Sequence, residues 1–312
     1  MPEGIEGAYR ALGREAATSG LGQPAVTNRL IACVRESLTL LAELPRADLI
    51  SHVSGKEYFV FERSVSKYRS SRGINKALFL SDIDEVIDTV SKVITGDVPN
   101  EPAELHSALY TAAISFPAAI DVTKDNDRKS PGTFLEYFVG HLVAATSGVR
   151  PTKTVVAPTL DLEISLPTDF IFDLGPGKSR IHLPVKLSTR ERVIQVWAHQ
   201  RVLDGMHGVN RFRGLLVVLA ETNRQTATNS IAEVCLPGQW TAYQMYIAQM
   251  HRVYYFDVPT PYRRLRDHYP FLQVRPFADF FYEWHEIALP TVAADSVEAN
   301  SPIAIKGIPE PE

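Results

Sequence analysis

The most regular pattern of hydrophobic and polar positions lies in the middle of the chain. From 162 to 203 the sequence reads LEISLPTDFIFDLGPGKSRIHLPVKLSTRERVIQVWAHQRVL. Polar and apolar residues alternate through DFIFDLG and RIHLPVKLS, with a Gly-Pro-Gly turn between them, and this period of two is typical of β-strands. Helical spacing follows from about 189 to 206. The pattern predicts a β-hairpin followed by a helix, and the rest of the chain is interpreted around this unit.

The predicted hairpin has one apolar face and one polar face. Because side chains alternate along a strand, the polar face gathers Asp169, Asp173, His182, Pro184 and Lys186. With the turn centred near Gly177, Asp169 falls across from Lys186 within about a residue, and such neighbours lie roughly 5 Å apart. The apolar helix and strand that come next predict that the hairpin sits in the middle of a sheet.

The elements around the hairpin predict an α/β fold. A helix over 133–148 ending at Gly148 precedes it, and 155–166 supplies a first strand. GLLVVLAET and RVYYFDVP are apolar runs of the kind expected for strands buried on both faces, separated by a helix near 240–250. Two further helices come near 261–269 and 277–288. The order favours a mixed central sheet flanked by helices.

The first part of the chain predicts a mainly helical region. Helical spacing covers most of the first 50 residues, a helix capped by Ser81 runs from about Asp82 to Ile94, and another is ended by Pro117. The polar stretch at 121–132 interrupts the pattern. We therefore expect an N-terminal region over 1–128, a core domain over 129–289 and a disordered tail over 290–312.

Composition restricts the function classes. The chain has 312 residues, 45% of them hydrophobic and 22% charged, as in a soluble globular protein. No apolar run approaches the roughly 20 residues that span a bilayer, so no membrane association is expected. Cys33 and Cys235 stand alone in apolar contexts, which argues against disulfides or a thiolate zinc site and favours a cytoplasmic location. A net charge of −4 still permits DNA binding if basic residues cluster.

The hairpin also carries a recognisable motif. Pro167-Thr168-Asp169 followed by Pro184-Val185-Lys186 resembles the PD-(D/E)xK nuclease superfamily, and especially its type II restriction endonucleases. The resemblance implies a Mg²⁺-dependent, sequence-specific endonuclease that hydrolyses double-stranded DNA as a homodimer. It makes Asp169 a metal ligand, the Val185 carbonyl a further ligand, and Lys186 the cation that positions the attacking water.

One position departs from that motif. Pro184 stands where the family has a second metal-binding acid, two residues before the lysine. Glu191 on the following helix is one replacement, although it also fits a capping box begun by Ser188. Glu136 on the preceding helix is the main alternative, and Glu163 is a third. Gln195 and His199 share a helical stripe with Glu191 and resemble a motif of the exonuclease branch.

Several basic residues are candidates for DNA contact, each with solvated surface as the competing interpretation. Arg190 and Arg192 lie at the positive end of the predicted helix, where phosphates bind readily. His182 and Asp173 are expected to shield the site or contact the DNA backbone, and Trp197 is expected in the core. The remaining candidates are His199, Lys67, Arg69, Arg72, Arg211 and Arg213, with a weaker stripe at Arg263, Arg264 and Arg266.

Two other functions remain open at this point. A repair or recombination nuclease of the same superfamily would favour structured or damaged DNA over a sequence. A non-catalytic DNA-binding protein could keep the fold without a working metal site, and Pro184 is the feature that favours this alternative.

Overall fold

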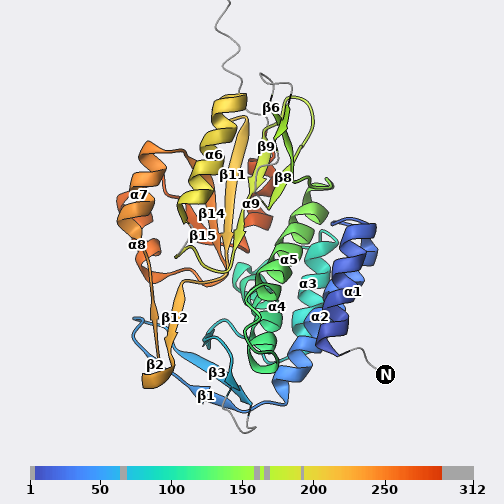
Figure 1. Ribbon diagram of the computed structural model, residues 1–312, viewed down its shortest axis with the longest axis vertical. Helices are drawn as coiled ribbons and strands as arrows, with labels where there is room; N and C mark the ends of the chain where they lie inside the picture. The colour runs from blue at the N-terminus through green and yellow to red at the C-terminus, as the bar shows by residue number, and fades with distance from the viewer. Residues whose placement is uncertain (1–3, 64–68, 158–161, 165–168, 191–192, 290–312) are drawn as a thin grey trace, which may run out of the picture.

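The computed structural model describes residues 4–63, 69–157, 162–164, 169–190 and 193–289 (Figure 1). The N-terminal region is built from helices, as predicted. Their bounds are α1 Ile5–Thr18, α2 Pro24–Ala42, α3 Ile83–Ile94 and α4 Pro102–Thr123, and α5 Ser130–Ser147 follows. Gly148 ends α5 in the left-handed conformation with φ 67°, which confirms the predicted stop.

Two helix boundaries differ from the prediction. The N-cap of α3 is Asp82 rather than Ser81, and its carboxylate accepts hydrogen bonds from the N–H groups of Asp84 and Glu85. Helix α4 continues through Pro117 to Thr123 instead of ending there. Pro117 is buried among other buried α4 residues, so tertiary packing outweighs the local cost of about 3 kcal/mol that a helix-interior proline carries.

Short strands connect the helical region with the rest of the chain. β3 Tyr58–Arg63 lies in the segment predicted to be extended, and it pairs with β1 Arg46–Asp48, β4 Arg69–Ser70 and β5 Ile74–Asn75. A separate small sheet joins β2 Ile50–Ser51 to β13 Ser230–Glu233 and β12 Thr222–Gln225. These strands were not predicted, except β3, because two- to four-residue segments show no periodicity.

The central sheet is mixed, which confirms the predicted fold class. Its order is β15 Val274–Pro276, β14 Met250–Tyr255, β11 Phe212–Val218, β9 Arg180–Leu183 and β8 Phe170–Phe172. Strands β9 to β15 run parallel, β8 is antiparallel to β9, and β10 Val185–Lys186 continues along β11. The segment predicted as a first strand instead forms its own hairpin of β6 Val155–Ala157 and β7 Leu162–Ile164.

The hairpin of β8 and β9 occupies the edge of this sheet, not its middle. β8 is the outermost strand, and an isolated bridge between Thr152 and Ile171 covers its free side. Phe170 pairs with Leu183, so the ladder continued by one residue sets Asp169 opposite Pro184. The prediction set Asp169 across from Lys186 within about a residue. In the structure Lys186 stands two residues beyond the pairing position, and its side chain still contacts Asp169.

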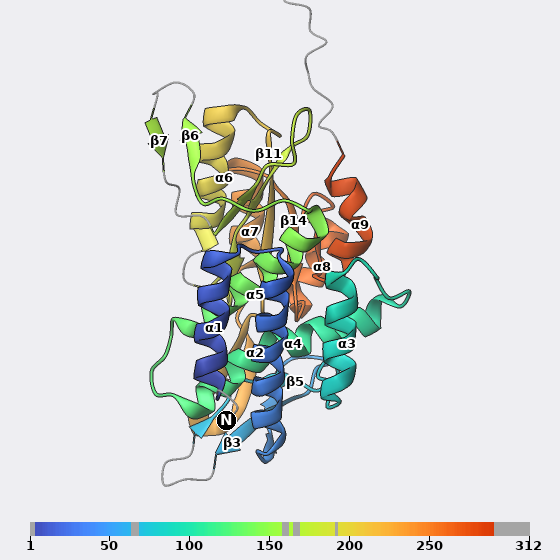
Figure 2. The same cartoon turned by 90° about the vertical axis from the view of Figure 1, so that its right-hand side faces the viewer.

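Helices cover both faces of the central sheet (Figure 2). On one face the buried residues of α4, α5 and α9 Asp279–Ile287 pack against alternate residues of the strands. On the other face lie α6 Val193–His207, α7 Pro237–Tyr246 and α8 Thr260–His268. The polar face predicted for the hairpin is therefore not open: Ile171 and His182 are buried beneath α6.

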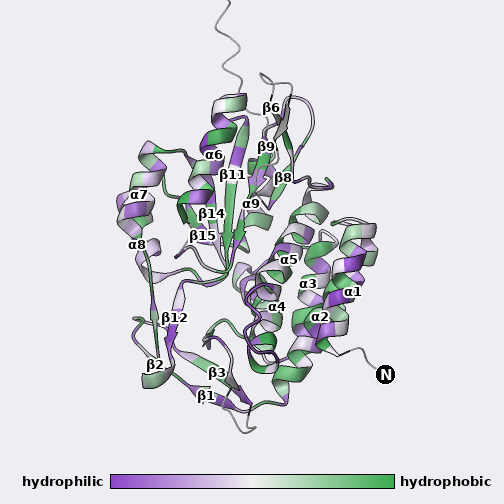
Figure 3. Ribbon diagram, viewed as in Figure 1, coloured by the Kyte–Doolittle hydropathy of each residue, from purple (hydrophilic) through white to green (hydrophobic). Residues whose placement is uncertain are grey.

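A single hydrophobic core joins the N-terminal helices to the sheet. It extends from Leu12 of α1 through Phe116 of α4 to Val217 of β11 and Tyr254 of β14. In Figure 3, β11 is hydrophobic along most of its length whereas β12 is hydrophilic, which matches their burial in the core and near the surface. Among the described residues, no helix has both the length and the apolar character to cross a membrane.

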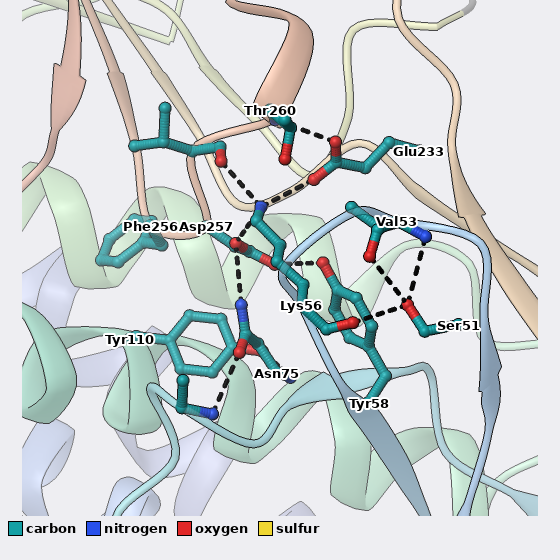
Figure 4. A network of polar contacts seen from close by, with 12 residues as sticks. Ser51, Val53, Lys56, Tyr58, Asn75, Tyr110, Glu233, Phe256, Asp257 and Thr260 are labelled. Atoms are coloured by element: carbon teal, nitrogen blue, oxygen red, sulfur yellow. Dashed lines mark hydrogen bonds and ion pairs between the residues drawn. The ribbon is translucent and has the colours of Figure 1, made fainter. Parts of the chain in front are cut away.

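A buried ionic network also joins the N-terminal region to the part of the chain that carries the central sheet (Figure 4). The Lys56 ammonium, between β2 and β3, donates to Glu233 Oε1 at 2.6 Å, Asp257 Oδ1 at 2.6 Å and the Val258 carbonyl at 2.7 Å. The Tyr58 hydroxyl donates to the other Asp257 oxygen at 3.0 Å. The side chains of Lys56, Glu233 and Asp257 are 8%, 6% and 2% exposed, so each charge depends on its partners.

We predict that Lys56→Ala lowers the free energy of unfolding by about 3–5 kcal/mol, because it leaves two buried carboxylates without a cation. Urea denaturation measures the difference. Lys92→Ala is the matched control, since Lys92 is 53% exposed and pairs with Asp88 on the surface of α3. A loss no larger than that of the control would show that the network does not hold the two parts together.

Candidate active site

Asp169 and Lys186 meet at the carboxyl end of the parallel strands. One Asp169 oxygen, Oδ2, accepts a hydrogen bond from the Val185 N–H at 2.6 Å and from the Lys186 ammonium at 2.8 Å. The Asp169 and Lys186 side chains are 13% and 30% exposed, so Asp169 is largely buried at the sheet edge whereas Lys186 is partly open to solvent. The structure thus brings together the two residues that the alternation of the hairpin predicted as neighbours.

Pro184 helps to set the geometry of Val185. The carbonyls of Pro184 and Lys186 accept from the N–H groups of Val217 and Leu219 on β11, both at 3.0 Å. Because successive residues of a strand direct their backbone groups to opposite sides, the Val185 N–H and carbonyl face away from β11 and toward Asp169. The Val185 carbonyl is therefore oriented toward the Asp169 side, as a further oxygen ligand would need to be.

Glu136 brings a second carboxylate to this place from α5. Its side chain is 28% exposed and its Oε2 lies 3.9 Å from the Lys153 ammonium. Burial raises the pKa of Glu136, the negative charge of Asp169 raises it further, and the positive charges of Lys153 and Lys186 oppose these effects. A bound cation would relieve the repulsion between these two carboxylates.

Helix α6 passes over the same pair. His199 is half-buried, and burial together with the charge of Lys186 lowers its pKa whereas Asp169 acts in the opposite direction. Gln195, one turn earlier, is exposed. Glu191 and Arg192 lie outside the described residues, so the replacement of the missing acid by Glu191 stays a prediction. The side chain of Glu163 is likewise outside the described part.

Sequence reasoning missed Glu221, which fixes the segment that follows Lys186. This buried carboxylate stands just after β11 and accepts the Ser188 hydroxyl at 2.6 Å, the Thr189 N–H at 2.9 Å and the Thr189 hydroxyl at 2.6 Å. The Tyr255 hydroxyl adds a fourth hydrogen bond at 2.8 Å. An acid directly after the apolar run LLVVLA was the available signal, because such a position is at the end of a buried strand.

His182 has a structural role that the sequence did not reveal. It is fully buried, and its Nδ1 lies 3.0 Å from Gln200 Oε1 on α6. The Gln200 amide donates to Asp204 and to the Phe212 carbonyl, so its oxygen accepts and His182 Nδ1 carries the proton. Burial lowers the pKa of His182 to about 4. Contact between His182 and a DNA backbone, one of the expectations, is therefore excluded, whereas Trp197 is fully buried in the core as expected.

Two of the basic candidates are held by protein partners. The Arg72 guanidinium makes two hydrogen bonds to Asp121, at 2.8 and 2.9 Å. Arg213 donates to the carbonyls of Glu286 and Ile287 at the end of α9. Both guanidinium groups thus have roles in holding the fold, whatever else they contact.

The other basic candidates are distributed along the surface. Arg190 is exposed, and its Nε donates to the Ser188 hydroxyl at 3.0 Å. Arg211 borders a surface cavity of about 610 Å³ together with Asp173, which pairs with Arg180 at 2.9 Å. Arg263 and Arg264 are exposed on α8. Lys67 and the side chains of Arg69 and Arg266 lie outside the described residues.

The oxygen donors around Asp169 fit a magnesium ion. Mg²⁺ prefers hard oxygen ligands and is commonly held by one or two carboxylates plus waters. Asp169, Glu136 and the Val185 carbonyl are donors of this kind. Within the described residues there is no group of three or more His, Cys, Asp and Glu side chains placed to hold a metal, so a carbonyl, waters or substrate oxygens would complete the coordination.

The fold is that of a type II restriction endonuclease. It is similar to the solved structure of the type IIP restriction endonuclease Kpn2I, with a TM-score of 0.77, 21% sequence identity, and coverage of 92% of this chain and 97% of that chain. A complex of the restriction endonuclease PspGI with substrate DNA gives a TM-score of 0.40 at 14% identity, over 65% of this chain and 92% of that one, too weak a likeness to argue from. No family model and no curated protein sequence matches the chain.

We predict that Glu136→Gln stabilises the metal-free protein at pH 7 by about 0.5–1 kcal/mol, as is common where a functional group is held in an unfavourable environment. The folded-state pKa of Glu136 lies above its ordinary value of 4.5, so the wild-type protein loses stability as the pH rises from 4.5 through that raised pKa. The variant lacks this loss. Urea denaturation at several pH values should show the difference opening above pH 4.5, and a variant less stable than wild type at pH 7 would contradict it.

Proposed function

We propose that the protein is a Mg²⁺-dependent, sequence-specific endonuclease of the type II restriction class that hydrolyses phosphodiester bonds in double-stranded DNA. The observation that carries the proposal is the Asp169 carboxylate, which accepts both the Val185 N–H and the Lys186 ammonium at an accessible edge of a restriction-endonuclease fold. A fold hosts many activities, so the site residues support the proposal more than the fold does.

The residues at this edge have separate roles in the proposal. Asp169 and the Val185 carbonyl would hold the metal ion, and Glu136 or Glu191 would supply the second carboxylate. When bound, the ion supplies positive charge to the phosphate and lowers the pKa of water. Lys186, whose ammonium contacts Asp169, would orient the attacking water and lend positive charge to the phosphate, and the proton of that water would pass to solvent. A new phosphorus–oxygen bond forms with the water, one ester bond breaks, and the leaving oxygen is protonated.

DNA contacts and assembly belong to the same proposal. Arg190 and Arg192 would clamp phosphates at the start of α6, with Gln195 and His199 further along the same side of the helix. We assign recognition of bases and formation of a homodimer to the N-terminal region over 1–128, joined to the nuclease core over 129–289. Such an enzyme would work in the cytoplasm, where it meets foreign DNA.

A non-catalytic DNA-binding protein is the alternative with an observation in its favour. Pro184 has no carboxylate, and the described residues include no group of three metal-binding side chains. Glu136 argues against this alternative, because two neighbouring carboxylates repel each other and a protein that binds no metal gains nothing in return. A nuclease that acts on branched or damaged DNA differs from the main proposal in substrate alone.

We predict that the purified protein cuts phage DNA into discrete fragments in the presence of Mg²⁺, and that Asp169→Ala reduces the rate about 10²–10³-fold or more, the scale expected for loss of a group that stabilises transition-state charge. Gel electrophoresis of the products measures both. Binding of the variant to DNA should persist, because Asp169 contributes no positive charge.

Asp88→Ala is the matched control, since Asp88 is a 62% exposed acid on α3 that pairs with Lys92. Nicking confined to branched DNA would support the structure-specific nuclease. Binding without any cleavage by the wild-type protein, on a range of phage DNAs, would overturn the enzymatic proposal.

A further inference from the structure

A second group of charges lies next to Asp169 on the side of α1 and α5. A cavity of about 270 Å³ opens there, and Glu136 forms part of its wall. Phe170, the residue after Asp169, forms another part. The cavity therefore shares a wall with the candidate active site. Its other lining residues include Gly20, Thr133, Tyr137, Arg150 and Lys153.

Arg150 lies against Gly20 at the edge of this cavity. Gly20 has φ +88°, and a Cβ placed on it would lie 2.7 Å from Arg150 Nε and 2.8 Å from Arg150 Cζ. The absence of a side chain at Gly20 thus gives the guanidinium its place. Arg150 is exposed, and no carboxylate among the described residues pairs with it. An arginine without a carboxylate partner has its N–H donors available for a ligand.

Lys153 adds a second cation to the same wall. Its ammonium lies 5.2 Å from the centre of the Phe170 ring, a cation–π contact, and 3.9 Å from Glu136 Oε2. The side chain is 61% exposed, so the contact with Glu136 is weak and screened by solvent. Two cations face one acid here, and that acid belongs to the candidate metal site. The cavity therefore has an excess of positive charge.

We propose that Arg150 and Lys153 bind a phosphate of the DNA strand next to the one that is cleaved. The inference rests on the proposed nuclease function and adds a binding subsite to it. The planar guanidinium matches two phosphate oxygens, and the ammonium supplies a second charge. Glu136 borders both places, so a strand whose phosphate sits at Asp169 and Lys186 would pass over this cavity with its neighbouring phosphate.

The test uses the full-length protein and a fluorescently labelled duplex of arbitrary sequence, since backbone contacts do not depend on sequence. Anisotropy gives the binding constant at several salt concentrations in the presence of Ca²⁺. We expect the double variant Arg150→Gln with Lys153→Gln to bind more weakly, and the slope of log K against log salt to fall by about 0.9 for one lost phosphate contact. Arg150→Lys keeps the charge and should keep the slope.

Lys92→Gln on α3 is the control for loss of a surface charge outside the cavity, and thermal denaturation checks that every variant is folded. Unchanged affinity and slope in the double variant, with binding by the wild type intact, would overturn the phosphate subsite and leave the proposed function standing. Absence of binding by the wild-type protein would instead overturn the proposed function, and the subsite with it.

Discussion

Three carboxylates lie at the carboxyl ends of the parallel strands, and the fold has to supply a compensating partner for each of them. Asp257 follows β14, Glu221 follows β11, and Asp169 stands beside the end of β10. Each acid is largely or fully removed from water, so each needs its own compensation. The partners that compensate the three carboxylates differ, and this difference distinguishes the two structural acids from the acid of the candidate active site.

Two of these acids are fully committed to the fold. Asp257 forms an ion pair with the buried Lys56 ammonium and so joins the N-terminal region to the sheet. Glu221 accepts hydrogen bonds from hydroxyl and N–H groups and so fixes Ser188 and Thr189, which lead into α6. Asp169 is the exception. Its partner Lys186 is 30% exposed. A second carboxylate, Glu136, adds charge repulsion to this site instead of relieving it. A site of this kind gains from a cation and an anionic substrate together.

The parts of this arrangement that follow local rules could be predicted. Alternation along a strand is local, so the chain itself indicated that Asp169 and Lys186 would approach each other, and the order of elements indicated a mixed sheet between helices. Glycine in the left-handed conformation ended α5 as expected. The resemblance of the hairpin to restriction endonucleases added the class of fold, which the likeness to Kpn2I confirms.

What could not be predicted depends on contacts between distant segments. The edge position of β8, the burial of His182 under α6 and the continuation of α4 through Pro117 are all decided by packing. The place of Arg150 likewise depends on Gly20, far away in the chain. Such juxtapositions leave no periodic signal in a single sequence, so an exposed arginine such as Arg150 could not be told from ordinary surface.

In the proposed enzyme, Asp169, the Val185 carbonyl and a second carboxylate from Glu136 or Glu191 would hold the metal ion beside Lys186. Anomalous scattering from crystals soaked in Mn²⁺, a substitute for Mg²⁺ with the same preference for oxygen ligands, would locate such an ion. We expect an anomalous peak in contact with the Asp169 carboxylate that is lost in Asp169→Asn. A peak bound elsewhere, with none at Asp169 in the wild-type crystal, would contradict it.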